Sequence, residues 1–402
     1  MVRKRVLLLG NYPPPFGGVP THIQYLADHL SARAWDVHVV SYVGRRAGLE
    51  EGHNYPVYRL LRRSRWAQLL RPSCKDLPHL WAHRRAAVGT LRLLLSWIGT
   101  MHFVRQLVRR QGIHLVSAYH LLGAGVVGSW LHREFGTGLI TTIFGEIYNE
   151  PALHRRRLHD VSQVVEHSAR LLSCSHHCAA SFRLLGLSPY VETVHYGVDI
   201  TRFRPGCGGD ALRRGLGIMP SVPVAIYVAR MVREMGLGVL MEAIPEVLLR
   251  RPEVVFLVVG RRGELTPAAQ ALATRYPGQV IVAPDVPFAQ LPAYYDASSF
   301  GVAPSINDRA CLGLAIAEAM ATARPVIGAG VGGTAEVIAD GETGILVPPE
   351  DPSSLVRAIL ELVDDQERCR HMGQASRERA ITLFDKEVTN QRMERIFEEV
   401  LA

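Results

Sequence analysis

Short apolar runs alternate with glycine-containing turns and helical patterns along most of this chain. The first run, Val6–Leu9, is followed by a turn-rich stretch at 10–18 and then by apolar residues at helical spacing over 23–30. Another apolar run follows at Val37–Tyr42. A strand, a glycine loop and a helix in this order are typical of parallel α/β layers, because the helix carries the chain back to begin the next parallel strand. The pattern therefore predicts an α/β fold with parallel sheets.

The same alternation occurs in two blocks, separated by the Pro/Gly-rich stretch Phe203–Gly209, which we interpret as a linker. We predict a first domain at 1–200 that carries a basic insertion at 45–110, a second domain at 201–383, and a final helical segment at 384–402. Expected strands lie at 113–118, 139–144, 169–173, 224–228, 254–259, 280–283, 300–303, 325–327 and 344–347. Expected helices lie at 123–135, 267–276, 288–297, 314–321, 334–338, 352–362, 368–382 and 386–401, with one ending at 249. Two such domains predict a cleft between them, with functional groups at the carboxyl ends of the strands.

Composition limits the class of protein. The chain has 402 residues, of which 48% are apolar, so intrinsic disorder is excluded. The longest uncharged apolar stretch, Leu93–Val104, is short of the ~18 residues that a membrane-spanning helix needs. The apolar run after the basic N-terminus is too short for a signal peptide. Six cysteines without framework spacing fit a reducing compartment, so we expect a soluble cytoplasmic protein.

The formal charge of +8 comes from one part of the chain. Between Arg45 and Arg110 there are 14 lysines and arginines against three acidic residues, with tryptophans and leucines among them. This composition suits an interfacial helix on an anionic membrane, at the inner membrane face. It equally suits core helices whose arginines form a solvated face. Nucleic-acid binding fits less well, because no recognised module is present.

Two motifs at expected strand ends could bind an anion. Gly17 and Gly18 lie at the start of the first helix, where glycine permits close backbone approach and the helix offers unpaired N–H groups. A tight turn explains the same residues equally well. Arg230 follows the first strand of the second domain, where it could form two hydrogen bonds to a diphosphate, and Arg233 lies nearby. The alternative is a solvated arginine in an arginine-rich chain.

The stretch Pro304–Met320 is the most informative motif, because it joins a polar loop, a glycine and an apolar helix that contains Glu318. A carboxylate among apolar neighbours is costly to bury unless it accepts hydrogen bonds. A ribose diol would supply two donors. Capping of local backbone, or pairing with an arginine, explains Glu318 about as well.

Several stretches resemble glycosyltransferase family 4, in the order in which that family has them. They are Pro14-Pro-Phe-Gly-Gly-Val19, Gly197-Val-Asp199 followed by Phe203-Arg-Pro205, Arg324-Pro-Val-Ile327, Gly330-Val-Gly-Gly-Thr-Ala-Glu-Val-Ile338 and Asp340-Gly-Glu-Thr-Gly-Ile-Leu-Val-Pro348. The resemblance implies the GT-B fold, with two facing Rossmann-like domains, retaining chemistry and no essential metal or other cofactor. It also implies that the final helix, 386–401, crosses back to the first domain.

The resemblance also implies roles for individual residues. Gly17 and Gly18 would approach the phosphates of a nucleotide-sugar donor, and Arg230 would bind its diphosphate. Glu318 matches the second carboxylate of the family's E-x7-E pattern, which binds the ribose. The remaining implied donor contacts are the backbone near Gly313 and Leu314 for the sugar, and the backbone around Pro284 and Val286 for the base.

Three positions depart from the family pattern: Ala310 replaces the first E-x7-E carboxylate, Met235 replaces a phosphate-binding lysine, and Phe144 replaces a histidine of the first domain. The loss of a charged donor to a phosphate costs on the order of 1.5–3 kcal/mol. Neighbouring residues could compensate: Asn307 or Asp308 for the sugar hydroxyls and Arg233 or Arg309 for the phosphates, while Glu146 is expected to project from the opposite wall. We therefore count Asp308, Glu146 and Arg230 as candidate catalytic residues. The leaving diphosphate would itself accept the acceptor's proton.

Two weaker signals remain. Cys174, His176, His177 and Cys178 are metal-ligand types, but their close spacing makes a tetrahedral zinc site hard to build and favours packing and capping. Tyr119-His120 follows an expected strand, which suits an acceptor contact or, equally well, a satisfied and partly buried histidine.

The leading hypothesis is a retaining glycosyltransferase that moves a sugar from a nucleotide diphosphate sugar to an acceptor hydroxyl, in polysaccharide or glycolipid assembly. The basic segment suggests a lipid-linked or membrane-presented glycan acceptor. The alternative is a catalytically impaired relative that binds nucleotide sugars or glycans, as the three departures suggest. A phosphorylase or an epimerase on the same fold is a third possibility.

Overall fold

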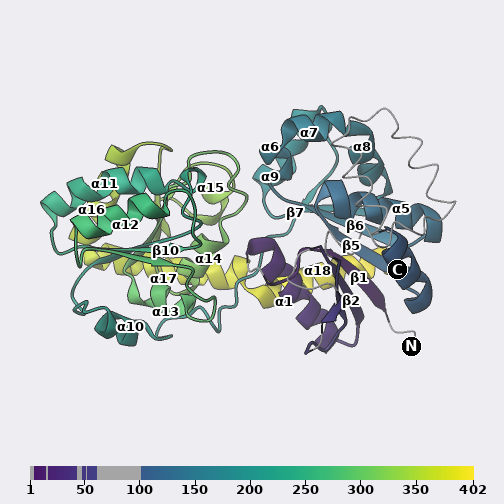
Figure 1. The fold of residues 1–402 in the computed structure, drawn as a ribbon, viewed down its shortest axis with the longest axis horizontal. Helices are drawn as coiled ribbons and strands as arrows, with labels where there is room; N and C mark the ends of the chain where they lie inside the picture. Colours follow the sequence, from purple (N-terminus) through teal and green to yellow (C-terminus); the bar gives the residue numbers. More distant parts are fainter. Residues whose placement is uncertain (1–3, 15–16, 43–47, 51, 61–100) are drawn as a thin grey trace. The chain divides into compact units, whose positions relative to one another are not determined.

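The computed structural model describes residues 4–14, 17–42, 48–50, 52–60 and 101–402, and in it the chain divides into two compact units. Unit 1 comprises 1–174, 179–194 and 390–402, and unit 2 comprises 175–178 and 195–389. The first change of unit therefore comes earlier than the expected boundary at 200, and the final change lies inside the last helix. Both units follow the predicted α/β plan (Figure 1).

In the described part of unit 1, eight strands form one sheet in the order β3-β4-β2-β1-β5-β6-β7-β8, and among them only β3 runs antiparallel to its neighbour. Its strands are β1 (Arg5–Gly10), β2 (Asp36–Ser41), β3 (Gly48–Glu50), β4 (Val57–Arg59), β5 (Leu115–Tyr119), β6 (Gly138–Ile143), β7 (Arg170–Ser173) and β8 (Glu192–Thr193). Its helices are α1 (Gly18–Ala32), α5 (Val126–Phe135), α6 (Glu146–Asn149), α7 (Pro151–Arg156), α8 (Leu158–His167), the end of α9 (His176–Ala180) and most of α18 (Lys386–Leu401).

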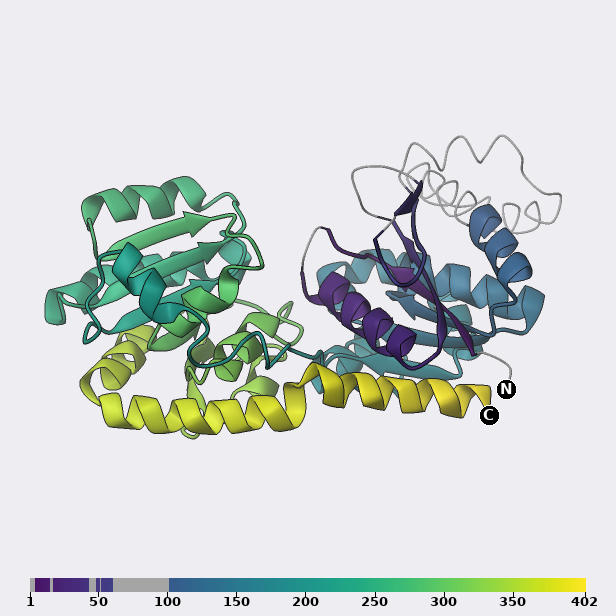
Figure 2. The same ribbon diagram turned by 90° about the horizontal axis from the view of Figure 1, so that it is seen from below.

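Helix α18 contributes to the core of unit 1 through its last three turns. Met393, Ile396 and Phe397 are buried, and the Phe397 ring packs edge-on against that of Trp35. The side chain of Asn390 donates to the backbone oxygen of Tyr25 in α1. Figure 2 shows α18 running along unit 1 beside this region.

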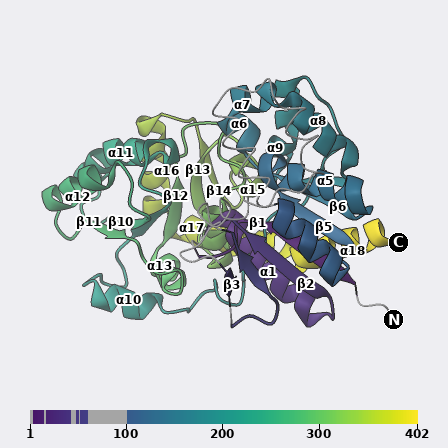
Figure 3. The same cartoon turned by 45° about the vertical axis from the view of Figure 1, so that its right-hand side comes forward.

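Unit 2 is a six-stranded, fully parallel sheet in the order β11-β10-β9-β12-β13-β14. Its strands are β9 (Val224–Val228), β10 (Val255–Gly260), β11 (Val280–Pro284), β12 (Phe300–Ala303), β13 (Val326–Ala329) and β14 (Gly344–Val347). Its helices are α10 (Gly209–Gly215), α11 (Leu237–Arg250), α12 (Thr266–Arg275), α13 (Leu291–Ala297), α14 (Leu314–Ala321), α15 (Thr334–Val337), α16 (Pro352–Asp364) and α17 (Gln366–Phe384). Helices α11, α12 and α16 cover one face of the sheet, and α10, α13 and α17 lie on the other (Figures 1 and 3).

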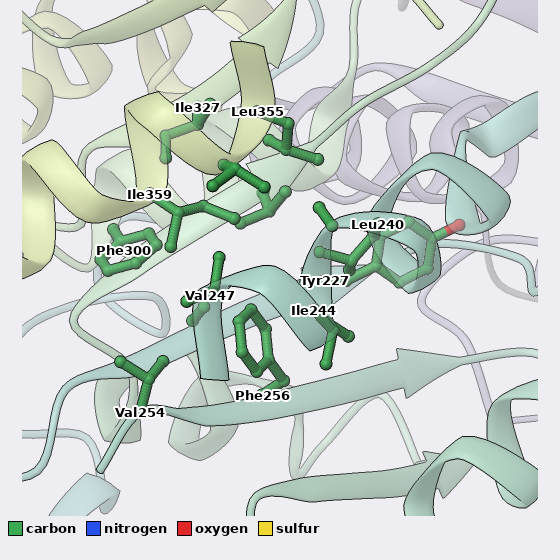
Figure 4. Packing of buried hydrophobic residues seen from close by; sticks show 14 of the residues in the cluster. Tyr227, Leu240, Ile244, Val247, Val254, Phe256, Phe300, Ile327, Leu355 and Ile359 are labelled. Atoms are coloured by element: carbon green, nitrogen blue, oxygen red, sulfur yellow. The ribbon is translucent and has the colours of Figure 1, made fainter. Parts of the chain in front are cut away.

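The core of unit 2 lies between the sheet and helices α11 and α16. Phe256 on β10, Ile244 on α11 and Ile359 on α16 are fully or almost fully buried in one cluster. Figure 4 shows these side chains pointing toward one another from the three elements. Strands buried on both faces read as continuous apolar runs, which is why the sequence located them within one or two residues.

Some elements do not follow the sequence expectations. Helices α6, α7 and α8 occupy 146–167, where no helix was expected, because their apolar residues are few. Ile147, Val161 and Val164 are buried in the core there, and Val165 packs against them. The helix expected from 123 begins at Val126, after an irregular turn at 121–125.

Part of the basic insertion, 45–110, packs into the core of unit 1. Residues 101–111 form a helix whose Met101, Val104 and Leu107 are buried in unit 1. Arg105 is also buried and pairs with Glu134 at 2.6 Å. The apolar residues of this helix thus follow the core-helix interpretation, whereas Arg105 is buried and does not lie on a solvated face. Most of the aromatic part, 61–100, lies outside the described residues. None of the described helices is both long and apolar enough to cross a bilayer.

Candidate functional site

The carboxyl ends of β9 and β12 are the switch point of the sheet in unit 2, where the strand order reverses. Parallel α/β sheets bind ligands at such points, because the loops there diverge to opposite faces. The loop after β9 carries Arg230 and the loop after β12 begins at Pro304. Gly236 has a φ of 73°, and a Cβ there would meet the Pro304 oxygen at 1.7 Å. Glycine is therefore required where the two loops touch.

One carboxylate links these two loops. Glu234 Oε2 lies 3.9 Å from Nη2 of Arg230, and its Oε1 lies 3.2 Å from Nη1 of Arg309. All three side chains are about half exposed. The backbone N–H of Ile306 also donates to the Glu234 backbone oxygen at 3.3 Å. Two predicted phosphate-binding arginines thus lie around one acidic group.

The loop at 307–311 is held by a hydrogen bond within it and by contacts with two other segments of unit 2. The Asn307 side-chain oxygen accepts the Arg309 N–H at 3.1 Å, and the Gly333 N–H donates to the Ala310 oxygen at 2.8 Å. The Asp308 backbone oxygen lies 2.7 Å from Nε2 of His177. Asn307 and Asp308 therefore lie on the same ordered loop as Ala310, the position that lacks the family's first carboxylate.

Helix α14 begins at Leu314, as predicted, after Gly313 in a left-handed conformation with a φ of 79°. Glu318 lies on the second turn of this helix and is only 5% exposed. Its Oε2 accepts the hydroxyl of the buried Tyr295 on α13 at 2.9 Å. Burial raises the pKa of Glu318 to about 7, although the Tyr295 hydrogen bond and the positive charge of Arg202 oppose the shift. Glu318 is thus partnered by a tyrosine, and neither backbone capping nor arginine pairing describes its hydrogen bond.

The remaining predicted donor residues lie on neighbouring loops of unit 2. Arg233 follows β9, and its backbone N–H donates to Glu264 on the loop after β10. Pro284 ends β11, and Val286 is separated from it by Asp285, which has a positive φ and pairs with Arg262 at 2.8 Å. These residues all lie at the carboxyl edge of the sheet.

Unit 1 has its own switch point between β1 and β5. Helix α1 begins at Gly18, directly after Gly17, as the sequence predicted. The buried Arg59, from β4, donates through Nη1 to the Tyr12 oxygen at 2.7 Å and through Nη2 to the Pro13 oxygen, and so holds the loop that leads to these glycines. This arginine belongs to the basic insertion but acts inside the fold.

The expectation that Glu146 projects from a wall is wrong. Its carboxylate is folded back and accepts the backbone N–H of Phe144 and, at 3.1 Å, that of Leu121. Nδ1 of His120 lies 3.5 Å from the same carboxylate. Burial alone would raise the pKa of Glu146, but the His120 interaction and the backbone hydrogen bonds outweigh it and lower this pKa. Glu146 therefore positions the two loops that follow β5 and β6.

The two residues predicted to contact the acceptor, Tyr119 and His120, differ in their exposure to solvent. Tyr119 is 1% exposed and stacks on Phe144, so its side chain does not face solvent. Its contact with an acceptor stays a prediction. The His120 side chain is one-third exposed, has an unusual φ of 82°, and meets the Phe144 ring edge-on at 4.8 Å. His120 thus lies beside the position where the family has its histidine.

The Cys-His stretch makes packing and capping contacts. Residues 175–178 belong to unit 2, where the backbone N–H groups of His176 and His177 donate to the two oxygens of Glu336 at 2.8 and 2.7 Å. Cys178 Sγ lies 3.9 Å from the Cys311 backbone oxygen. Within the described residues, no group of histidine, cysteine and acidic side chains is arranged to hold a metal ion.

Sequence reasoning missed Tyr295, Glu234 and Arg59. Tyr295 contacts a residue 23 positions away, and Glu234 contacts Arg309, 75 positions away, so no local motif could indicate these two contacts. Arg59 was counted as surface charge. A buried partner for Glu318 was foreseeable from the cost of burying a carboxylate, but its identity was not.

Two family models match the chain. Residues 16–202 match Glycosyltransferase Family 4, and residues 222–365 match Glycosyl transferases group 1. D-inositol 3-phosphate glycosyltransferase 2 of Catenulispora acidiphila is 32% identical over 307 residues, which cover 69% of this chain and 70% of that protein. D-inositol 3-phosphate glycosyltransferase of Streptomyces avermitilis is 35% identical over 196 residues, which cover 46% of this chain and 42% of that protein.

Solved structures give the same fold over the full length. Sucrose-phosphate synthase from Thermosynechococcus elongatus aligns with a TM-score of 0.79 at 21% identity and covers 99% of each chain. Anabaena HepE, solved in complex with UDP and glucose, aligns with a TM-score of 0.76 at 18% identity and covers 99% of this chain and 100% of its own. With the two parallel-sheet units described above, these matches establish the GT-B fold. The chain belongs to glycosyltransferase family 4.

Proposed function

We propose that this protein transfers a sugar, with retention of anomeric configuration, from a nucleoside diphosphate sugar to an acceptor hydroxyl. The observation that carries the proposal is the carboxyl edge of unit 2, where Arg230, the start of α14 and the buried Glu318 lie on adjacent loops and helices. An arginine, a helix N-terminus and a carboxylate suit a diphosphate, a sugar and a ribose diol respectively. The complexes of Anabaena HepE with UDP and with UDP-glucose support the same class of donor.

In the proposed reaction, the bond between the anomeric carbon and the diphosphate oxygen breaks while the acceptor oxygen bonds to the same face of the sugar. The acceptor's proton passes to an oxygen of the departing diphosphate, so no protein base and no metal is required. Arg230 then stabilises the negative charge that develops on the diphosphate. Asn307 and Asp308 are proposed to contact the sugar hydroxyls, and Gly17 and Gly18 to approach the phosphates.

The acceptor is proposed to carry its hydroxyl on a phosphorylated or lipid-linked polyol or glycan. The relatives named for inositol 3-phosphate favour a phosphorylated acceptor. The basic composition of 45–110 favours presentation at an anionic membrane, although the buried Arg59 and Arg105 do not contribute surface charge. Flotation with anionic liposomes at low salt tests this part, and protein that stays at the bottom of the gradient contradicts it. The cytoplasmic location stays a prediction.

A thermal-shift screen with UDP-, GDP-, ADP- and dTDP-sugars tests the donor. One nucleotide sugar, at a concentration well above its Kd, should raise the melting temperature, because it binds only the folded protein. Glu318→Ala should abolish the shift, and Glu246→Gln, an exposed change on α11, should keep it. An unchanged shift in Glu318→Ala would remove this residue from the ribose role, and no shift with any nucleotide sugar would contradict donor binding.

A non-catalytic donor-binding relative is the second candidate, because Ala310, Met235 and Phe144 each lack a polar group of the family pattern. Donor hydrolysis separates the two candidates. Release of free sugar from the donor that binds favours the enzyme. Tight binding without hydrolysis, and without transfer to any of a panel of acceptors, favours the binding protein.

A further inference from the structure

Three charged groups from two loops lie together at the switch point of unit 2. Arg230 comes from the loop after β9 and Arg309 from the loop after β12, and each guanidinium faces a different oxygen of Glu234. A diphosphate is bound in the same way, by two guanidinium groups that each face a different oxygen of the anion. The Glu234 carboxylate thus occupies the position of an anion between two cations of the chain.

The backbone on both sides of this arrangement is fixed. The close approach of Gly236 to the Pro304 oxygen locks the loops together, and the Ile306 N–H bond to the Glu234 oxygen adds a second tie. The Asn307 side chain holds the Arg309 N–H. The two arginines therefore start from defined backbone positions, which lowers the entropy that a ligand would lose in ordering them.

The ion pairs themselves are weak. The three side chains are between 45% and 48% exposed, and exposed pairs of this kind contribute at most about 1 kcal/mol each. Glu234 carries one negative charge, whereas a diphosphate offers more charge and several oxygens at the same place. A diphosphate can therefore displace Glu234 from the arginines, while Glu234 keeps them paired in its absence.

We propose that Arg230 and Arg309 form an anion clamp, which Glu234 occupies until the donor diphosphate replaces it, and that Arg309 supplies the cation that Met235 lacks. This inference rests on the proposed donor binding.

The test is calorimetric titration of the full chain with UDP, GDP, ADP and dTDP, and separately with inorganic pyrophosphate, at fixed salt. Arg309→Ala should weaken binding about tenfold, which corresponds to ~1.4 kcal/mol. Met235→Lys added to Arg309→Ala should restore most of the loss, because it returns an ammonium group to the family's position. Glu234→Gln should tighten binding several-fold, because it removes the competing carboxylate.

Matched controls are available on α11, where Arg250 and Glu246 form an ion pair of similar exposure at the opposite end of the helix from the loops. Arg250→Ala and Glu246→Gln should leave both affinities unchanged, and unliganded melting curves show that each variant is folded. Binding by Arg309→Ala within twofold of the parent, or no recovery with Met235→Lys, overturns the clamp. If pyrophosphate binds through Arg309 while no nucleotide binds, the clamp stands and the donor proposal fails.

Discussion

At the scale of single residues, the burial of the Glu318 carboxyl group has a consequence for the stability of the fold. The folded protein keeps a proton on Glu318 up to a pH of about 7, whereas the unfolded chain releases it near its ordinary pKa of 4.5. The folded state therefore binds more protons between these values, and the free energy of unfolding falls as pH rises through this window. The stabilisation is complete below the lower value and lost above the higher one.

Glu318→Gln should remove this pH dependence. The amide keeps an oxygen that can accept the Tyr295 hydroxyl but cannot ionise, so the variant should gain stability relative to the parent between pH 4.5 and 7, by on the order of 3 kcal/mol. Urea unfolding of both proteins across this range measures the difference. Glu246→Gln, a substitution at an exposed position, is the control. If the free energy of unfolding of Glu318→Gln changes with pH just as that of the parent does, the pKa of Glu318 is not raised by folding.

At the scale of secondary structure elements, the stability of unit 2 depends on the packing of α11 and α16 against one face of its sheet. Ile359→Ala on α16 removes a fully buried side chain and should cost about 2–5 kcal/mol of unfolding free energy. Leu249→Ala on α11, whose side chain is 84% exposed, should change it by less than about 0.5 kcal/mol. Chemical denaturation measures both. Equal effects of the two changes would mean that the core does not lie where the structure puts it.

The elements also show what a sequence can and cannot predict. Buried strands and Leu314–Ala321 were predicted closely, because apolar runs and a glycine before a helix are local signals. Helices α6 to α8 were missed, because their burial depends on partners elsewhere in the fold. At the candidate site, Arg230 and Glu318 were identified from motifs, whereas the contact of Glu234 with Arg309 and that of Tyr295 with Glu318 arise only because separate loops and helices meet. Arg59 shows the same limit, because its charge suggested a surface and its contacts lie inside.

At the scale of the whole molecule, unit 1 depends on the end of the chain. The buried Met393, Ile396 and Phe397 lie on α18, and Glu394 lies 3.0 Å from the side-chain nitrogens of both His29 and Trp35. Removal of 390–402 should therefore speed hydrogen exchange in α1, β1 and β2 and leave β9 to β14 unchanged. Mass spectrometry of exchanged peptides measures this. Arg395→Ala, a substitution at an exposed position of the same helix, should have no such effect. If exchange in α1, β1 and β2 of the truncated protein equals that of the parent, unit 1 does not depend on the end of the chain.

Because the last helix is divided between the two units, the chain cannot be separated at one position into two fragments that each contain a whole unit. A polypeptide that ends at 194 contains every strand that the structure describes in the sheet of unit 1. It lacks the buried residues of α18, which lie some two hundred positions further along the chain. A fragment of 195–402 carries those residues, with their apolar side exposed to water. The two fragments are thus complementary halves, and each should be obtained in good yield only when both are made together in the same cell.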